Sequence, residues 1–229
     1  MEPAATSQSA PPPRRWPAIA ALLFALVWLA CAWKPWFPQD WALENVLSLL
    51  TAWWLLRRHR RAPLSDLSYA LLLAFGIAHE VGSHYTYAEV PYDAWLQALF
   101  GAPLGPALGF ERNHYDRLVH FLFGLLCYRP LRELLASQLP TTSAASRWVP
   151  VTIAGTISLS YEIVEWFAAV LFGGDLGQAY LGTQGDVWDA QKDSGLALLG
   201  ALVAAALGIV ADRVRRHLIQ VSADAQRPP

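Results

Sequence analysis

The chain has 229 residues, of which 55% are hydrophobic and only 15% are charged, and its mean hydropathy is +0.28. A soluble domain of this size would carry more charges, spread more evenly along the chain. The net charge of -1, without a long basic run containing aromatics, gives no support to nucleic-acid binding. Charges instead fall in blocks between long apolar stretches. This pattern predicts an all-α fold, a polytopic bundle of about six transmembrane helices.

The apolar stretches divide the chain into three parts. Residues 1–15 are rich in Pro, Ala and Ser, which predicts a disordered tail. A single transmembrane domain is expected over residues 16–213, followed by a cytoplasmic tail over 214–229. The predicted spans of this domain are residues 17–33, 41–56, 67–79, 117–128, 149–172 and 194–211. The first is expected to be an uncleaved helix, because several spans follow it.

Lysine and arginine are distributed unevenly between the predicted loops. With a cytoplasmic N-terminus, the inner segments hold thirteen of these cations: Arg14, Arg15, Arg57, Arg58, Arg60, Arg61, Arg129, Arg132, Arg147, Arg213, Arg215, Arg216 and Arg227. The outer segments hold four: Lys34, Arg112, Arg117 and Lys192. This bias agrees with the positive-inside rule and predicts that both termini are cytoplasmic.

The predicted orientation places most of the other polar residues toward the outer side. Glu162 lies about 20 Å along its predicted span, which is roughly 10 Å below the outer boundary of a core about 30 Å thick. Glu165 lies one helical turn higher. Ionisable groups at such depth are costly unless they are paired, so they indicate a functional or structural polar site.

Helical spacing identifies further groups that would share one face with partners in the same segment. These groups are Asp116 with His120, Glu162 with Glu165, Glu80 with His84 beside His79, and Asp186 with Asp189 and Asp193 if a helix begins near Asp186. Four segments would therefore bring acids and histidines to one level of the membrane.

Three interpretations of these residues remain open. The first is a divalent metal site that could activate water, made from some of His79, Glu80, His84, Asp116, His120, Glu162 and Glu165. Zn²⁺, Mn²⁺ or Fe would suit such ligands, although no HExxH spacing occurs. A metal-dependent hydrolase of a lipid-linked substrate would follow from it.

The second interpretation is an outward-facing cavity that binds a lipid headgroup or another polar ligand of the envelope, with Arg112, Arg117 and Lys192 as anion contacts. The third is a structural network in which these cations only neutralise the carboxylates, as in a membrane scaffold. No catalytic residue is assigned, and composition leaves both enzyme activity and the oligomeric state open.

Two smaller patterns complete the prediction. Residues 93–100 could form a short amphipathic helix after Pro91, in a connection that would be either a lid or a covering loop. Residues 101–109 contain too much Gly and Pro for a regular helix. In the last span, a stripe of small residues predicts close helix packing: Gly195, Gly200, Ala204 and Gly208.

The blocks "HYTYAEVP", "RNHYDRLVHF", "SLSYEIVEW" and "AYLGTQGDVWDAQKD" resemble those of the YjdF-like bacterial inner-membrane proteins. The resemblance implies a location in the bacterial inner membrane and supplies no reaction. It also implies that a shared polar set contains His84, Tyr85, Arg112, Asp116, Arg117, His120, Glu162, Glu165, Asp186, Asp189 and Asp193. With Lys192, this set is the predicted ligand-binding site.

A fainter similarity links the chain to VanZ-like membrane proteins. The blocks "YDRLVHF", "YEIVEW" and "DVWDAQKDSGLALLGA" follow the order of that pattern. The chain departs from it at Glu165, where Gln is usual, and before Ser194, where Lys192-Asp193 replaces the usual Asn. By analogy, the similarity implies lipid or wall chemistry at the cell envelope.

Overall fold

The computed structural model describes residues 15–140, 143–172 and 181–225, and every regular element within these ranges is a helix. The helices are α1 (Trp16–Ala32), α2 (Pro38–His59), α3 (Asp66–His84), α4 (Tyr92–Phe100), α5 (Leu104–Leu108), α6 (Tyr115–Leu134), α7 (Ala145–Phe172) and α9 (Asp189–Ala225). The prediction of an all-α fold is confirmed. The predicted disordered tail at 1–15 lies outside the described residues, apart from Arg15.

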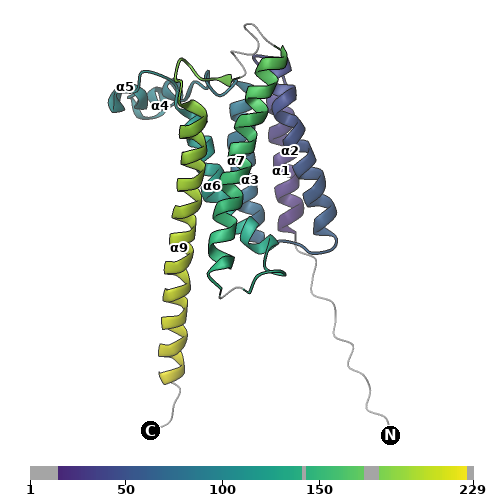
Figure 1. Ribbon diagram of the computed structural model, residues 1–229, viewed down its shortest axis with the longest axis vertical. Coiled ribbons are helices and arrows are strands. Elements are labelled where there is room, and N and C mark those ends of the chain that lie inside the picture. The colour runs from purple at the N-terminus through teal and green to yellow at the C-terminus, as the bar shows by residue number, and fades with distance from the viewer. Residues whose placement is uncertain (1–14, 141–142, 173–180, 226–229) are drawn as a thin grey trace.

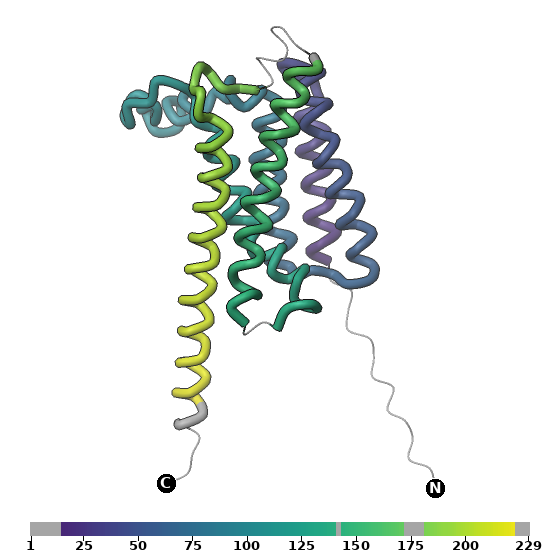
Figure 2. The backbone as a smooth tube through the Cα atoms, viewed as in Figure 1, coloured from purple at the N-terminus to yellow at the C-terminus, as the bar shows by residue number. Residues whose placement is uncertain are grey.

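The six longer helices run along one common direction, whereas α4 and α5 lie across it at one end of the bundle (Figure 1). The first residues of α1 and the last turns of α9 lie toward the opposite end. In the backbone trace, α1 and α2 form one outer side and α9 forms the other, and α3, α6 and α7 lie between them (Figure 2). Each long helix overlaps one of the predicted apolar segments.

Local sequence signals explain where several of these helices begin and end. The Ser65 side chain caps α3 by accepting a hydrogen bond from the Ser68 N–H at 3.2 Å. Gly101 and Gly109, with φ of 76° and 70°, end α4 and α5 in the left-handed region that favours glycine. The predicted helix at 93–100 is confirmed as α4, which follows Pro91.

The expectation that residues 101–109 contain no regular helix is wrong, because α5 forms there. The carboxylate of Asp93 accepts hydrogen bonds from the N–H groups of Leu104 and Gly105, both at 2.8 Å. These two donors lie in the first turn of α5 and would otherwise lack partners. A cap supplied from α4 therefore stabilises a helix that its own composition does not favour.

The closest helix packing joins α6 to α9 through glycine. A Cβ at Gly124 would lie 1.8 Å from the Ala197 carbonyl oxygen, and a Cβ at Gly200 would lie 2.1 Å from that of Phe121. Side chains at these positions would therefore force the two backbones apart. The predicted packing role is confirmed for Gly200 but is wrong for Gly195, where an added Cβ would meet no atom of the described residues within 4 Å.

Two described helices are long and apolar enough to span a membrane by length and composition, over Ala145–Leu171 and Asp189–Ser222. A third, α1, is apolar but has 17 residues. The other long helices carry charges, such as Asp40 and Arg57 in α2. The count of six spans is therefore not established by composition. The helix α9 continues through the predicted tail as far as Ala225.

A pair of glycine substitutions tests the α6–α9 contact. Alanine favours a helix over glycine by about 1 kcal/mol, so Gly195→Ala should leave stability unchanged or raise it. Gly200→Ala should instead lower the free energy of unfolding by about 1–3 kcal/mol, because overpacking against backbone cannot be relieved by a rotamer change. Thermal unfolding of both purified variants in detergent measures the difference. Equal stability of the two variants would contradict this packing.

Candidate functional site

A network of charged side chains connects α6 and its preceding loop to the start of α9. The guanidinium group of Arg112 donates to both carboxylate oxygens of Asp189, at 2.6 and 3.3 Å, and also to the Thr183 carbonyl at 2.9 Å. The side chains of Arg112 and Asp189 are only 12% and 5% exposed. A buried, two-pronged pair of this kind has the strongest geometry available to an ion pair.

Asp186 is shared by the other two cations of this network. Arg117 donates to its carboxylate and also, at 3.3 Å, to Asp189. The ammonium group of Lys192 donates to the same Asp186 oxygen at 2.5 Å. The helix α9 begins at Asp189, so Asp186 lies just outside it rather than on its first turn. Asp186 instead accepts a hydrogen bond from the Trp188 N–H just before the helix.

Two titratable groups of this network, Asp186 and His114, lie outside the helices and have lowered pKa values. The hydrogen bond from Lys192, with further ones from the Trp188 N–H and Arg117, holds the pKa of Asp186 well below its usual range. Partial burial, followed by the charges of Arg117 and Arg112, lowers the pKa of His114. Asp186 is thus held ionised and His114 neutral, so that two carboxylates, Asp186 and Asp189, face three cations in this network.

A second polar cluster lies one helical turn further into the bundle. The Nε2 atom of His120 lies 3.5 Å from the Asp116 carboxylate and 3.2 Å from that of Glu162. Its Nδ1 atom makes a hydrogen bond of 3.0 Å with the Ser158 hydroxyl. Asp193 joins this group from α9, and single ligand atoms of Asp116, His120 and Asp193 all lie within 4.8 Å of one another. The cluster therefore combines α6, α7 and α9.

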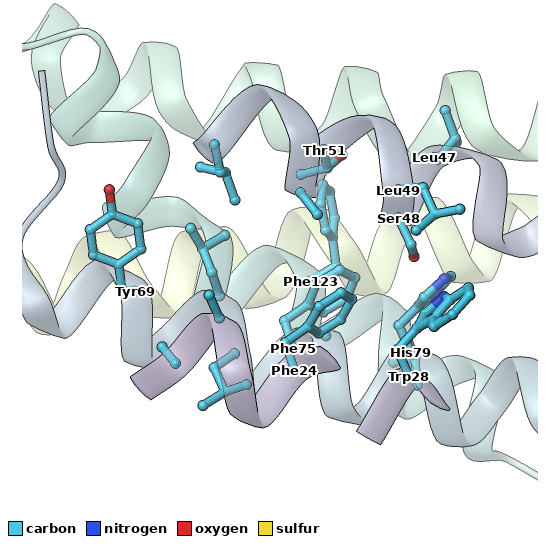
Figure 3. A pocket seen from close by; sticks show the side chains of 18 of the residues that line it. Phe24, Trp28, Leu47, Ser48, Leu49, Thr51, Tyr69, Phe75, His79 and Phe123 are labelled. Atoms are coloured by element: carbon cyan, nitrogen blue, oxygen red, sulfur yellow. The ribbon is translucent and has the colours of Figure 1, made fainter. Parts of the chain in front are cut away.

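A cavity of about 740 Å³ lies beside this cluster. Its walls come from α1, α2, α3, α6 and α7, and the side chains of Phe24, Phe75 and Phe123 gather at its centre (Figure 3). Trp28 and His79 lie together toward one end, and Tyr69 lies toward the other (Figure 3).

Most of the lining is apolar, but acids and histidine interrupt it. Asp116 and His120 line the cavity from α6, and Tyr161 and Glu165 line it from α7. None of Arg112, Arg117 and Lys192 is among its lining residues within the described part of the chain. The predicted anion contacts are therefore separated from this cavity and occupied by Asp186 and Asp189.

The remaining predicted site residues are more widely distributed. His84 makes a 2.8 Å hydrogen bond with the Cys31 carbonyl, and Tyr85 packs its ring against those of Trp36 and Trp95. Both contacts are made at the end of α3, away from His120. The structure does not add them to the cluster.

His79 lines the same cavity as Asp116 and His120, but neither His79 nor Glu80 belongs to the described metal-ligand group at His120. The Nδ1 atom of His79 makes a 2.5 Å hydrogen bond with the Tyr87 hydroxyl, and Glu80 is fully buried beside Asn45 and Ser48. Two of the seven predicted metal ligands, Asp116 and His120, belong to the described group with metal-ligand spacing. The third member of this group is Asp193, which was not among the seven.

Three residues that shape this region are absent from the site predicted from the sequence. Glu44 of α2 is 4% exposed and accepts a hydrogen bond from the Tyr161 hydroxyl, which joins α2 to α7. Ser158 holds His120 from the same face of α7. An acid inside an apolar segment was a detectable signal for Glu44. Ser158 and Tyr161 lie on the helical face of Glu162 and Glu165, so spacing could have found them.

Comparison with known proteins assigns the chain to a family. A family described as "Predicted membrane protein (DUF2238)" matches residues 16–213, and the chain belongs to it. The chain is also 37% identical over 163 residues to the inner membrane protein YjdF of Escherichia coli (strain K12). This alignment covers 71% of the chain and 74% of that relative. No solved structure matches the chain.

These matches confirm the resemblance to YjdF-like inner-membrane proteins and show that the chain is a membrane protein of that type. The VanZ-like similarity stays a prediction. The residues of both polar clusters lie within the matched range of 16–213.

Removing one partner of the Arg112–Asp189 pair should be strongly destabilising. Arg112→Met and Asp189→Asn should each lower the free energy of unfolding by about 3–5 kcal/mol, because each leaves a buried group without its counter-charge. The double variant should lose less than the sum, which a double-mutant cycle measures.

The pair between Arg132 and Asp212 supplies the matched control for this cycle. The Arg132 Nη2 and Asp212 Oδ2 atoms lie 3.7 Å apart, and the two side chains are 24% and 42% exposed. Asp212→Asn should cost about 1 kcal/mol or less, as exposed pairs do. Strict additivity of the Arg112 and Asp189 effects would show that the two groups do not interact.

Replacing Lys192 tests the ionisation of Asp186. A carboxyl with a depressed pKa contributes stability above its unfolded pKa, about 3.9, and loses it as the pH falls through the lower folded value. Lys192→Met should bring the folded pKa of Asp186 closer to the unfolded value. The fall in melting temperature between about pH 5 and pH 3 should therefore be shallower than in the wild type. Lys34→Met is the control and should keep the wild-type slope.

Proposed function

We propose that this protein is a six-span inner-membrane protein that binds a membrane amphiphile in the cavity between α1–α3 and α6–α7. The single observation that carries this proposal is the cavity lining, which is apolar over most of its length and acidic at one side. The volume of about 740 Å³ is typical of sites for small organic ligands.

The arrangement of the helices supports six spans with cytoplasmic termini. At 1.5 Å per residue, helices of 17 to 37 residues are about 26 Å or longer, close to or above the thickness of a bilayer core. The start of α1 and the end of α9 lie toward one end of the bundle, as an even number of crossings requires (Figure 1). Arginines concentrate at that same end, which favours the cytoplasmic side.

The outward faces of these helices support the same topology. Large apolar side chains such as Leu22, Leu29, Val170 and Leu207 are each about 60% exposed. In water they would form an apolar surface far larger than a soluble monomer carries. In a bilayer these side chains contact lipid tails, which are equally apolar.

The apolar part of the cavity fits a hydrocarbon tail. The rings of Phe24, Phe75 and Phe123 line its middle, and Leu55 and Leu72 add aliphatic surface from α2 and α3. Each buried CH₂ group of a tail contributes about 0.8 kcal/mol, so a chain of several carbons supplies substantial affinity. Because these walls lie within the expected spans, a ligand would enter from the bilayer.

The polar side of the cavity selects the head of the amphiphile. The lining acids Asp116 and Glu165 lie there with His120, and none of the three outer cations reaches the lining. The sequence predicted an anionic headgroup bound by arginine. In this cavity such a headgroup would instead face carboxylates, which repel it. A head that bears hydroxyl or amine groups would donate hydrogen bonds to these acids instead.

A cavity-filling substitution tests this proposal. Ala52 lines the cavity on α2, and Ala52→Trp should occupy part of the space of the tail. We expect wild-type protein, purified in a mild detergent, to retain about one lipid per chain in native mass spectrometry. The variant should weaken lipid binding about tenfold or more, equivalent to about 1.4 kcal/mol.

Ala30→Trp is the matched control, because Ala30 is exposed on α1 and lies outside the cavity lining. This variant should retain lipid as the wild type does. Wild-type protein without any retained lipid, or equal retention by the Ala52 and Ala30 variants, would contradict amphiphile binding in this cavity.

A further inference from the structure

The cluster at the side of the cavity has the geometry of a metal site. One ligand atom from each of Asp116, His120 and Asp193 lies within 4.8 Å of the other two. First-row metal ions bind such N and O ligands at about 2.0–2.2 Å, so two ligand atoms of one ion lie at most about 4.4 Å apart, and a small closure of these side chains brings all three onto one ion. The ligands come from two helices, α6 and α9, whose contact is the closest in the bundle.

The hydrogen bond of His120 suits metal binding. In the tautomer that binds a metal through Nε2, the Nδ1–H group donates to the Ser158 hydroxyl at 3.0 Å. The Nε2 lone pair then points toward the carboxylates of Asp116 and Glu162, at 3.5 and 3.2 Å. A lone pair that faces carboxylates is repelled unless a metal ion or a proton lies between them.

Asp193 provides an independent observation that favours a cation at this site. The residue is 1% exposed, and its Oδ1 atom is buried without a hydrogen-bond partner among the residues that the structure describes. The nearby cations are engaged elsewhere, since Arg117 and Lys192 both donate to Asp186. A buried carboxylate oxygen without a partner is costly, and a bound cation removes that cost.

We infer that Asp116, His120 and Asp193 bind one divalent transition-metal ion, such as Zn²⁺ or Mn²⁺. One imidazole and two carboxylates are ligands that these ions accept, whereas the soft thiolates preferred by Cu(I) are missing from this group. Glu162 is the nearest additional carboxylate and supplies a fourth ligand from α7. Ser158 is a positioning residue, because it acts on the ion through His120.

The ion would face the cavity, because Asp116 and His120 are among the described residues that line it. A coordination position on that side is open to an oxygen atom of the ligand head. This last consequence rests on the proposed amphiphile binding, whereas the metal site itself does not.

Direct metal titration tests the site on the full chain. Purified protein is stripped with chelator in detergent and titrated with Zn²⁺, Mn²⁺ and Co²⁺, the last of which reports its ligands through visible absorption. We expect one ion per chain by elemental analysis, and loss of that stoichiometric binding in Asp193→Asn. Ser158→Ala should weaken binding about 10–100-fold, as loss of an orienting partner does.

Glu80→Gln supplies the matched control. Glu80 is a fully buried carboxylate on α3 that lies outside the cluster, so its replacement should leave metal stoichiometry unchanged. Wild-type protein that binds none of the three ions at one per chain overturns the inference. A folded Asp193→Asn protein with wild-type affinity also overturns it. If that variant misfolds on size exclusion, His120→Asn and the Ser158→Ala affinity decide the question.

The cavity variant separates the two proposals. Ala52→Trp should bind metal as the wild type does while losing lipid. Failure of the metal titration with normal lipid retention would remove the metal site alone. Metal binding without any lipid retention would remove amphiphile binding alone.

Discussion

The close approach of α6 and α9 is the contact on which the rest of this structure depends. Gly124 and Gly200 allow the two helix backbones to touch, and neither position has room for a Cβ. On α6, His120 lies one turn before Gly124, and Asp116 lies one turn before His120. On α9, Asp193 lies one turn before Ala197, and Asp189 lies one turn before Asp193. The glycine contact therefore sets the distance between the polar side chains of α6, Asp116 and His120, and those of α9, Asp189 and Asp193.

The ion-pair network at the start of α9 and the polar cluster at His120 form an outer and an inner layer, which differ in how their charge is balanced. In the outer layer, Arg112, Arg117 and Lys192 meet Asp186 and Asp189 in short ion pairs. The structural network that the sequence offered as one alternative therefore describes this layer well. In the inner layer, acids and histidine cluster without a lysine or arginine bonded to them in the described part of the chain. This inner imbalance is where a ligand or ion contributes most, because an unpaired carboxylate away from water costs more than a paired one.

Position within the fold separates residues that look alike in the sequence. His79, His84 and His120 all occupy helices near acids, and each was a candidate metal ligand. His84 makes its hydrogen bond to the Cys31 carbonyl and His79 makes one to Tyr87, whereas His120 alone of the three meets Asp116 and Asp193. Helical spacing predicts which residues of one helix share a face. It cannot predict which neighbouring helix covers that face.

The sequence by itself determined the class of protein, the approximate position of every long helix and the segments that carry acids, because apolar periodicity is a local property of the chain. It also predicted the packing role of Gly200 and the short helix α4. The tertiary structure decided that the three cations pair with Asp186 and Asp189, and that Asp193 joins Asp116 and His120. It also decided that Asp93 caps α5, which local composition argued against. These outcomes depend on distances between residues far apart in the chain, which only the packing of the helices sets.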